Sequence, residues 1–165
     1  MSIRFQLGKK VAMNFERLIV LLLVCLCGCQ KATISPGHSF TLRLANNVAT
    51  PGMTETTLRA TGESVFLASQ DIVTGPDFKS VLKSIDEYGR PAIVFRVNEA
   101  AGKRMREIFS KNQGNMFAMV INGTPELAIT IAEPFDNEFR LTGAYTADEI
   151  DQTYSAITGR KLKRK

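Results

Sequence analysis

The chain has 165 residues, of which 44% are hydrophobic and 22% charged, and it contains no tryptophan. That length, less a targeting segment, suffices for about one small domain with a single core. The formal net charge is +5, but residues 1–28 carry +3 and residues 160–165 carry +5. The part between them is at about −3, so the high isoelectric point does not indicate nucleic-acid binding.

An apolar segment near the N-terminus predicts a signal peptide. It extends from Leu18 to Leu26, directly after Arg17, and it is too short for a membrane-spanning helix, which needs about 20 residues. A positively charged start followed by a short apolar core is typical of a secretory signal. Translation from either Met1 or Met13 would give such a start. An uncleaved membrane anchor is the alternative interpretation.

The end of the apolar segment, Leu26–Cys29, resembles the bacterial lipobox, in which the cysteine is lipidated and becomes the first mature residue. The resemblance implies that residues 1–28 are a lipoprotein signal peptide and that Cys29 carries the lipid, with palmitate as an expected acyl chain. All three cysteines lie between positions 25 and 29, so the mature domain would have neither a disulfide nor a free thiol. Gln30 is not the aspartate associated with inner-membrane retention, which favours the outer membrane over the inner one.

Residues 29–39 contain serine, threonine, proline and glycine and are predicted to be a tether. The only histidine, His38, lies near its end and is interpreted as a solvated residue rather than a ligand or base. Phe40–Leu44 alternates apolar and polar side chains, which predicts a half-buried strand. The polar segment Asn46–Gly62 is predicted to be a loop, and Val65–Ala68 a second short strand.

The segment Phe78–Asp86 is ambiguous. Its apolar side chains recur at helical spacing between a proline and a glycine, so periodicity alone favours a helix. As a strand, it would place Lys83 on the same face as two apolar side chains, which is a poor strand pattern. The family resemblance described below favours a strand that pairs with Pro91–Val97.

Two helices have more regular patterns. The first extends from Glu99 to about Asn112 behind a capping asparagine, and its apolar side chains form a single stripe. That stripe consists of Ala101, Met105, Ile108 and Phe109. The last helix begins with a capping box of Thr146 and Glu149 and ends at Gly159. Its buried stripe consists of Ile150, Tyr154 and Ile157.

Between the helices, Asn115–Ile121 and Glu126–Ala132 are predicted strands joined by Asn122–Pro125. Asn-Gly between two apolar segments is a strong hairpin signal, because both residues tolerate a positive φ. Phe139–Leu141 is a further short strand. We therefore predict an α+β domain over residues 40–159: an antiparallel sheet with both helices packed on one face, as in a ferredoxin-like open sandwich. A basic tail, residues 160–165, follows.

Five motifs follow one another along the chain, at Thr74–Phe78, Asp86–Pro91, Asn98–Met105, Asn112–Gly123 and Leu141–Glu149. In this order they resemble the head subdomain of the first periplasmic domain of the SecD and SecDF protein-export proteins. The resemblance covers the chain from about Glu63 to Ile157. The sequence departs from the family at Asn122, where an aspartate is usual, and at Asn115, where a lysine is usual.

The resemblance implies a function in binding rather than in transport. Export by the SecDF family draws on a proton gradient through transmembrane helices, and we expect none after the head-like region here. We therefore expect a lipid-anchored periplasmic module that contacts a polypeptide or an envelope partner without transport activity of its own. An extended segment could add to a sheet edge. The alternative is a structural envelope lipoprotein that docks to a folded membrane protein.

No residue stands out as a catalytic group, so we expect no enzyme activity, no cofactor and no metal. The carboxylates of Glu133, Asp136 and Glu138 could form an acid pair or a divalent-ion site, although a solvated loop is the simpler interpretation. Phe135, between these carboxylates, is the candidate contact residue. Either its ring is partly exposed and touches a partner, or it plugs the end of the sheet.

The lipoprotein interpretation predicts the behaviour of one variant. Cys29→Ser should abolish lipid labelling and signal cleavage and leave a larger precursor, because the lipid-accepting thiol is gone. Incorporation of labelled palmitate, gel mobility and membrane fractionation measure this outcome. A Cys29→Ser protein that is processed and fractionates like the parent would contradict the interpretation.

Overall fold

Eight strands and two α-helices follow one another in the part of the chain that the computed structural model describes, residues 32–160 except 36, 134 and 136. Their bounds are β1 Phe40–Asn46, β2 Met53–Thr57, β3 Ser64–Val73, β4 Phe78–Ile85, β5 Pro91–Val97, α2 Glu99–Ser110, β6 Met116–Ile121, β7 Thr124–Thr130, β8 Glu138–Leu141 and α3 Ala147–Thr158. A short 3-10 helix, η1 Gly75–Asp77, connects β3 to β4. The predicted signal peptide, Cys29 and the tail beyond Arg160 lie outside the described residues.

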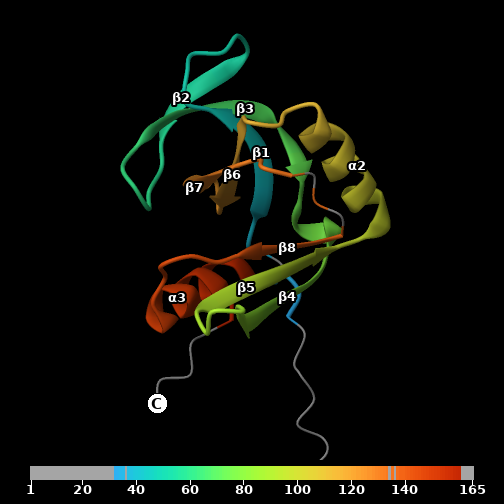
Figure 1. Ribbon diagram of the computed structural model, residues 1–165, viewed down its shortest axis with the longest axis vertical. Helices are drawn as coiled ribbons and strands as arrows, with labels where there is room; N and C mark the ends of the chain where they lie inside the picture. Colours follow the sequence, from blue (N-terminus) through green and yellow to red (C-terminus); the bar gives the residue numbers. More distant parts are fainter. Residues whose placement is uncertain (1–31, 36, 134, 136, 161–165) are drawn as a thin grey trace, which may run out of the picture. The chain divides into compact units, whose positions relative to one another are not determined.

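The strands form two antiparallel sheets rather than one. Five strands pair in the order β2-β3-β1-β6-β7 and three in the order β4-β5-β8, and Figure 1 shows them as two layers. The chain passes from one sheet to the other at η1, where a carboxylate oxygen of Asp77 accepts a hydrogen bond from the N–H of Thr74 at 2.9 Å. The predicted α+β class with antiparallel strands is confirmed, whereas the single sheet is wrong.

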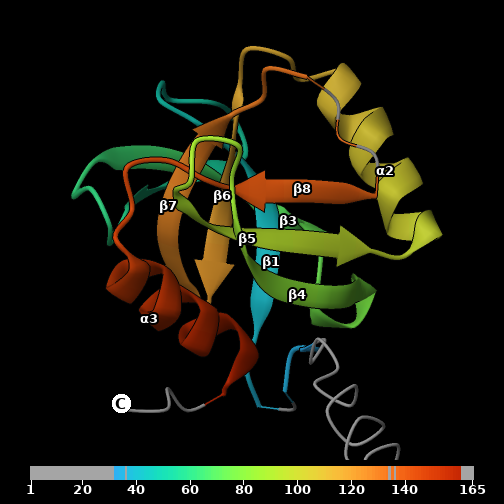
Figure 2. The same cartoon turned by 60° about the horizontal axis from the view of Figure 1, so that its bottom comes forward.

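The two helices pack against different sheets. α2 contacts β3 of the five-stranded sheet, and α3 contacts β4 and β5; Figure 2 shows α3 alongside the smaller sheet. The predicted packing of both helices on one face therefore needs correction, and the ferredoxin-like open sandwich is not confirmed. The hydrophobic pattern of a strand determines its buried face but not its neighbour in the sheet. Neither of these helices is long and apolar enough to cross a bilayer.

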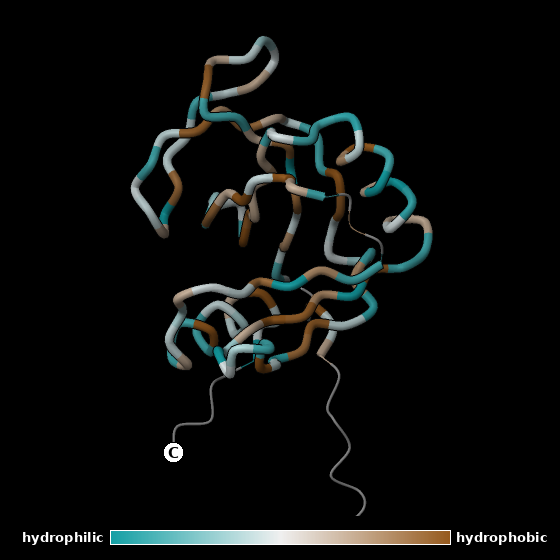
Figure 3. Tube along the Cα trace, in the orientation of Figure 1, coloured by the Kyte–Doolittle hydropathy of each residue, from teal (hydrophilic) through white to brown (hydrophobic). Residues whose placement is uncertain are grey.

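A cluster of phenylalanine rings fills the space between the two sheets. Phe40 of β1 stacks on Phe95 of β5 with ring centroids 5.3 Å apart, and Phe95 stacks on Phe139 of β8 at 4.7 Å. Phe117 of β6 stacks in turn on Phe109 of α2 at 5.2 Å. All five rings are buried. The core thus joins both sheets and α2, and Figure 3 shows hydrophobic segments along the strands of both layers.

The start of α2 agrees with the prediction, and its buried face agrees except at one position. The side chain of Asn98 accepts a hydrogen bond from the N–H of Ala101 at 2.8 Å, so it is the predicted N-cap. The predicted stripe is buried apart from Ile108, which is only partly buried. Gly102 is buried instead, and the helix ends at Ser110, two residues before the predicted end.

The two ends of α3 also agree with the prediction. Thr146 and Glu149 form the capping box. Gly159 ends the helix with a φ of 69°, a backbone conformation that residues other than glycine rarely adopt. A Cβ at Gly159 would lie 2.5 Å from the ring of His38. The Nδ1 atom of His38 lies 3.3 Å from the carbonyl oxygen of Ala156. The histidine is therefore packed against the end of α3 and is not the solvated residue predicted.

Ala32, Ile34, Ser35 and His38 contact the domain, so the predicted tether needs correction at these residues. Ala32 is fully buried and forms an antiparallel bridge with Val81, whose N–H donates to the carbonyl of Ala32 at 2.8 Å. Ile34 packs against the core, and the N–H of Ser35 donates to the carbonyl of Thr158. The composition argument overlooks the two apolar side chains of this segment.

β4 is a strand although its apolar spacing is helical. A β-bulge between Phe78 and Ser80 shifts the register, so Phe78 and Val81 are both buried although strand alternation would place them on opposite faces. Lys83 is accommodated because its Nζ lies 2.7 Å from a carboxylate oxygen of Asp151 on α3. The strand prediction, which the family resemblance favours, is confirmed.

The structure differs from the prediction at one strand, β2, and at the start of another, β7. β2 lies inside the predicted loop Asn46–Gly62, because an edge strand can be polar on both faces. In the β6–β7 hairpin the turn consists only of Asn122 and Gly123, which have φ values of 50° and 80°. β7 therefore begins at Thr124, two residues before the predicted strand.

One carboxylate holds the turn between β4 and β5. Oδ1 of Asp86 accepts hydrogen bonds from the N–H groups of Tyr88 and Arg90 at 2.9 and 2.8 Å. Oδ2 accepts from Nε of Arg90 at 2.7 Å and from the hydroxyl of Thr142 at 2.6 Å. The Thr142 hydrogen bond is the largest of the effects that hold the pKa of Asp86 well below its usual range, while burial opposes them.

We expect Phe109→Ala to lower the free energy of unfolding by about 3–5 kcal/mol, because it removes a fully buried ring that joins α2 to β6. Denaturant unfolding of the full chain measures the loss. Lys103→Ala, at an exposed position of the same helix, is the control and should change stability little. Equal stability of Phe109→Ala and the parent would show that the ring does not anchor α2.

We also expect Asp86 to make stability depend on pH. Its pKa is about 3.9 in an unfolded chain and lower in the fold. Ionised Asp86 therefore stabilises the fold above about pH 4, and this contribution is lost as the pH falls toward the folded-state pKa. Asp86→Asn should be less stable than the parent at pH 7 and lose less on acidification to pH 3. Glu87→Gln, in the same turn, should keep the parent's acid profile; a parental profile in Asp86→Asn would overturn the assignment.

Candidate functional site: a groove beside α3

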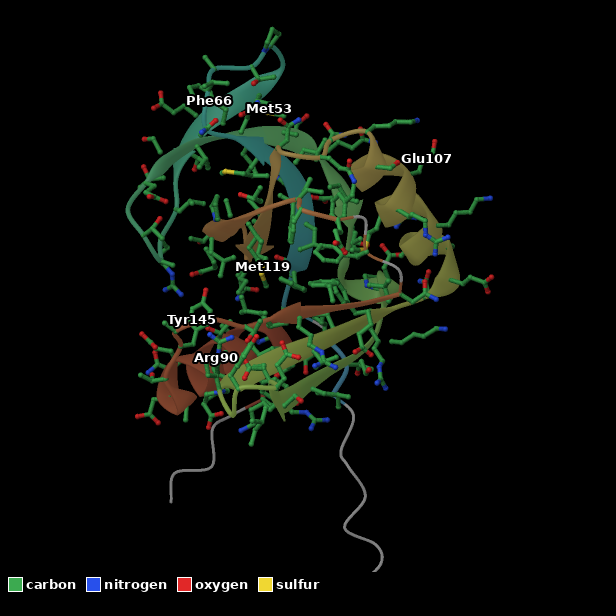
Figure 4. All side chains as sticks on the ribbon, in the orientation of Figure 1. Met53, Phe66, Arg90, Glu107, Met119 and Tyr145 are labelled. Atoms are coloured by element: carbon green, nitrogen blue, oxygen red, sulfur yellow. The ribbon has the colours of Figure 1, made fainter. Side chains whose placement is uncertain are left out.

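A groove of about 420 Å³ lies between α3 and one end of the five-stranded sheet. β6 and β7 supply its floor, α3 and the residue before its cap supply one wall, and the β2–β3 connection supplies the other. The lining residues are Arg59, Ala60, Met119, Ile121, Glu126, Leu127, Tyr145, Glu149, Gln152, Thr153 and Ala156. Figure 4 labels Met119 and Tyr145, which line it from the sheet and from the α3 side.

The floor of the groove is apolar. Met119 and Ile121 lie two residues apart on β6 and so share one face of the strand, and Leu127 of β7 lies beside them; all three are buried. Ala156 presents only a methyl group from α3, so the wall does not fill the groove. An apolar side chain that entered here would leave water for a hydrophobic surface.

The wall opposite α3 is a loop bonded to β7. The N–H groups of Arg59 and Ala60 donate to the carbonyls of Pro125 and Glu126 at 3.0 and 2.9 Å. In addition, Nε of Arg59 lies 2.8 Å from a carboxylate oxygen of Glu126. We call these contacts of residues 59–60 with residues 125–126 the latch. Because β2 and β7 are the two edges of the sheet, the latch connects one edge to the other through the loop that follows β2.

The α3 wall offers a carboxylate and a neutral hydroxyl. Glu149 accepts hydrogen bonds from the N–H and the hydroxyl of Thr146 at 2.8 and 2.9 Å, and these bonds lower its pKa. Burial is the main cause that raises the pKa of Tyr145, and the negative charge of Glu149 is the second cause. The Tyr145 hydroxyl therefore stays protonated at neutral pH and can donate a hydrogen bond.

The predicted contact residue, Phe135, does not line this groove. It is partly buried, and its ring centroid lies 5.6, 5.9 and 5.8 Å from those of Phe109, Phe117 and Phe139. The ring therefore belongs to the aromatic core on one side, and its role in a partner contact stays a prediction. The lipidation of Cys29 also stays a prediction, because that residue lies outside the described part of the chain.

Of the three carboxylates predicted near Phe135, Asp136 lies outside the described residues, and Glu138 is paired with arginines rather than with another acid. Glu138 lies 2.7 Å from Nε of Arg96 and 3.5 Å from a terminal nitrogen of Arg140, and the Arg96 hydrogen bond is the main cause that lowers its pKa. Glu133 is exposed. Among residues 32–160, with the gaps given above, no group of three or more His, Cys, Asp or Glu is placed to hold a metal ion. The expectation of no enzyme activity stays a prediction.

Sequence reasoning missed the groove because its lining comes from three distant segments. Residues 59–60 lie in a predicted loop, residues 119–127 in a predicted hairpin, and residues 145–156 in and before a predicted helix. The local pattern of each segment already accounts for its residues without a groove. The one available signal was the small side chain of Ala156 beside the buried stripe of α3, and a lone alanine on a helix is weak evidence of a groove.

Comparison with known protein families identifies a match over most of the chain. The model of the family described as SecDF, P1 head subdomain, matches residues 53–162. The protein translocase subunit SecD of Acidaminococcus fermentans is 27% identical over 81 residues, which is 48% of this chain and 19% of that protein. The subunit of the same name from Aquifex aeolicus is 27% identical over 89 residues, 53% of this chain and 18% of that protein. The chain thus spans about a fifth of the length of these relatives.

Solved structures show the same likeness at the level of the fold. The crystal structure of SecDF in its super-membrane-facing form aligns with a TM-score of 0.52 at 18% identity and covers 73% of this chain and 19% of the other. SecDF of Thermus thermophilus, described as a translocon-associated membrane protein, aligns with a TM-score of 0.54 at 15% identity and covers 92% of this chain and 21% of the other. At such identities the likeness concerns the fold alone.

Proposed function

Because the chain belongs to the SecDF P1 head subdomain family, we propose that it is a binding module that holds an extended polypeptide segment in the groove beside α3. The observation that carries the proposal is the apolar floor of Met119, Ile121 and Leu127 beneath polar walls. An extended segment presents alternate side chains to one side. Its apolar side chains would lie on the floor, and its polar groups would meet the walls.

The proposal includes a location and a limit on activity. A lipid on Cys29 anchors the module on the periplasmic side of the cell envelope, at the outer membrane in preference to the inner one. The lipobox-like residues Leu26–Cys29 support this part. The module binds without transport activity of its own and is not an enzyme; it retains a segment for whatever process its partners carry out.

One observation favours a second function, docking to a folded membrane protein as a structural envelope lipoprotein. Ile85 and Tyr88, at the β4–β5 turn, are 67% and 74% exposed. The guanidinium of Arg90 lies 4.9 Å from the centroid of the Tyr88 ring, and Asp86 fixes the backbone beneath it. A tyrosine and an arginine held in a preformed turn suit a contact with a folded surface, because little ordering is needed on binding.

A groove-filling variant tests the binding proposal. Gln152 is exposed on α3 and lines the groove, so Gln152→Trp should occupy the space without disturbing the core. We expect at least a tenfold loss of affinity, about 1.4 kcal/mol, for a short fluorescein-labelled peptide in which leucine and threonine alternate. Fluorescence anisotropy with the full chain measures the affinity.

Gln113→Trp is the matched control, because Gln113 is exposed and does not line the groove. Both variants should melt at the parent temperature, and the control should bind the peptide like the parent. Absence of peptide binding, or equal affinities for Gln152→Trp and the parent, would contradict the proposal. Capture of a folded membrane protein that Tyr88→Ala abolishes and Gln152→Trp leaves unchanged would support the second function instead.

A further inference from the structure

We propose that the latch occupies the position at the β7 edge where a polypeptide binds. An incoming segment displaces the latch and adds as a strand to the same edge of β7. This inference rests on the proposed function, and it names how the segment is held. The partner is an extended polypeptide segment that supplies backbone N–H groups, apolar side chains at alternate positions and one lysine or arginine.

The β7 edge needs hydrogen-bond donors at the latch. The register of the β6–β7 hairpin shifts between Met119 and Val120, so that Leu127 pairs with Met119 and Pro125 pairs with Val120, which leaves Glu126 as the extra residue of a bulge. A bulge interrupts the alternation of backbone groups along a strand. This explains how the carbonyls of Pro125 and Glu126, which are neighbours in sequence, both accept hydrogen bonds from the loop. Proline has no N–H group, so at Pro125 and Glu126 the β7 edge mainly accepts hydrogen bonds.

The loop meets this need with backbone N–H groups, the same kind of donor that an added strand supplies. Two consecutive backbone N–H groups, of Arg59 and Ala60, donate to the two carbonyls, and main-chain hydrogen bonds are the source of affinity when a strand adds to a sheet. The latch covers only the first residues of β7, which continues as the outer strand to Thr130. An incoming segment would therefore gain the latch contacts and more of the edge beyond them.

The latch can open without unfolding the hairpin behind it. The base of the loop is closed by two hydrogen bonds, from the N–H of Leu58 to the carbonyl of Glu63 at 2.9 Å and from the N–H of Gly62 to the carbonyl of Leu58 at 2.8 Å. Leu58 is buried, whereas Arg59 and Ala60 are exposed. The side chain of Arg59 is 68% exposed, so moving it outward uncovers little further surface of the arginine.

The latch also indicates the charge that the segment should carry. The side chain of Glu126 is only 13% exposed and is paired with Arg59. If Arg59 left, this carboxylate would lose its cation in a partly buried place, which is unfavourable. A lysine or arginine of the segment would replace Arg59 there, while neighbouring apolar side chains would reach Met119 and Leu127 on the floor.

Hydrogen exchange of the full chain tests the displacement. The probe is a short fluorescein-labelled peptide of alternating leucine and threonine with one central lysine. Saturating peptide should accelerate the exchange of the Arg59 and Ala60 amides at least tenfold, because they lose their acceptors, whereas the β1–β6 ladder should keep its protection. A peptide with every backbone nitrogen methylated should not bind, because it has no N–H donors on either edge.

Two arginine variants show whether the latch competes with the peptide or helps to bind it. Arg59→Gln weakens the latch and should bind the peptide about threefold tighter, because more of the protein is already open. Arg96→Gln breaks a surface pair of the same kind, with Glu138, and should leave affinity unchanged. Weaker binding by Arg59→Gln would make Arg59 a direct contact and overturn the proposal. If the peptide binds while both amides stay protected, only the latch inference falls; if it does not bind at all, the proposed function falls as well.

Discussion

The contact between Phe40 and Phe95 is the interaction on which the described structure depends. The two sheets are joined by side-chain packing rather than by strand pairing, and these rings, one from each sheet, are fully buried. Aromatic rings bury large areas, so a few of them can hold two layers together. Phe139 and Phe117 extend the contact to β8 and β6. Because the rings already join the two sheets, each helix packs against its own sheet, α2 on the five-stranded sheet and α3 on the three-stranded one.

The same aromatic core sets the geometry of the groove. α3, one wall, contacts the three-stranded sheet, whereas the floor on β6 and β7 belongs to the five-stranded sheet. The spacing between wall and floor is therefore the spacing between the layers, which the buried rings keep. A floor of buried strand residues with one wall made of an exposed loop would suit the proposed binding of segments of varied sequence, because only the loop would have to adjust.

Features set by neighbouring residues could be predicted from the sequence, and features set by distant ones could not. The capping box of α3 and the Asn122-Gly123 turn are local, and their residue patterns predict them. The strand at Phe78–Ile85 required the family resemblance, because a bulge disguises its alternation. The division into two sheets, the burial of Ala32 and the groove depend on pairings that no short window contains. The latch was missed for the same reason, since residues 59–60 and 125–126 are far apart in sequence.

The bridge between Ala32 and Val81 also protects the protein against self-association. β4 is an outer strand of the three-stranded sheet, and an open strand edge is a template on which a second chain can pair and aggregate. Here the backbone of Ala32 covers the middle of that edge, and the exposed lysines Lys79 and Lys83 flank it. Charged side chains at these positions repel another copy of the same strand. On the proposal above, foreign strands are received at β7 and excluded at β4, so that polypeptide capture and protection against aggregation would lie at different edges of the molecule.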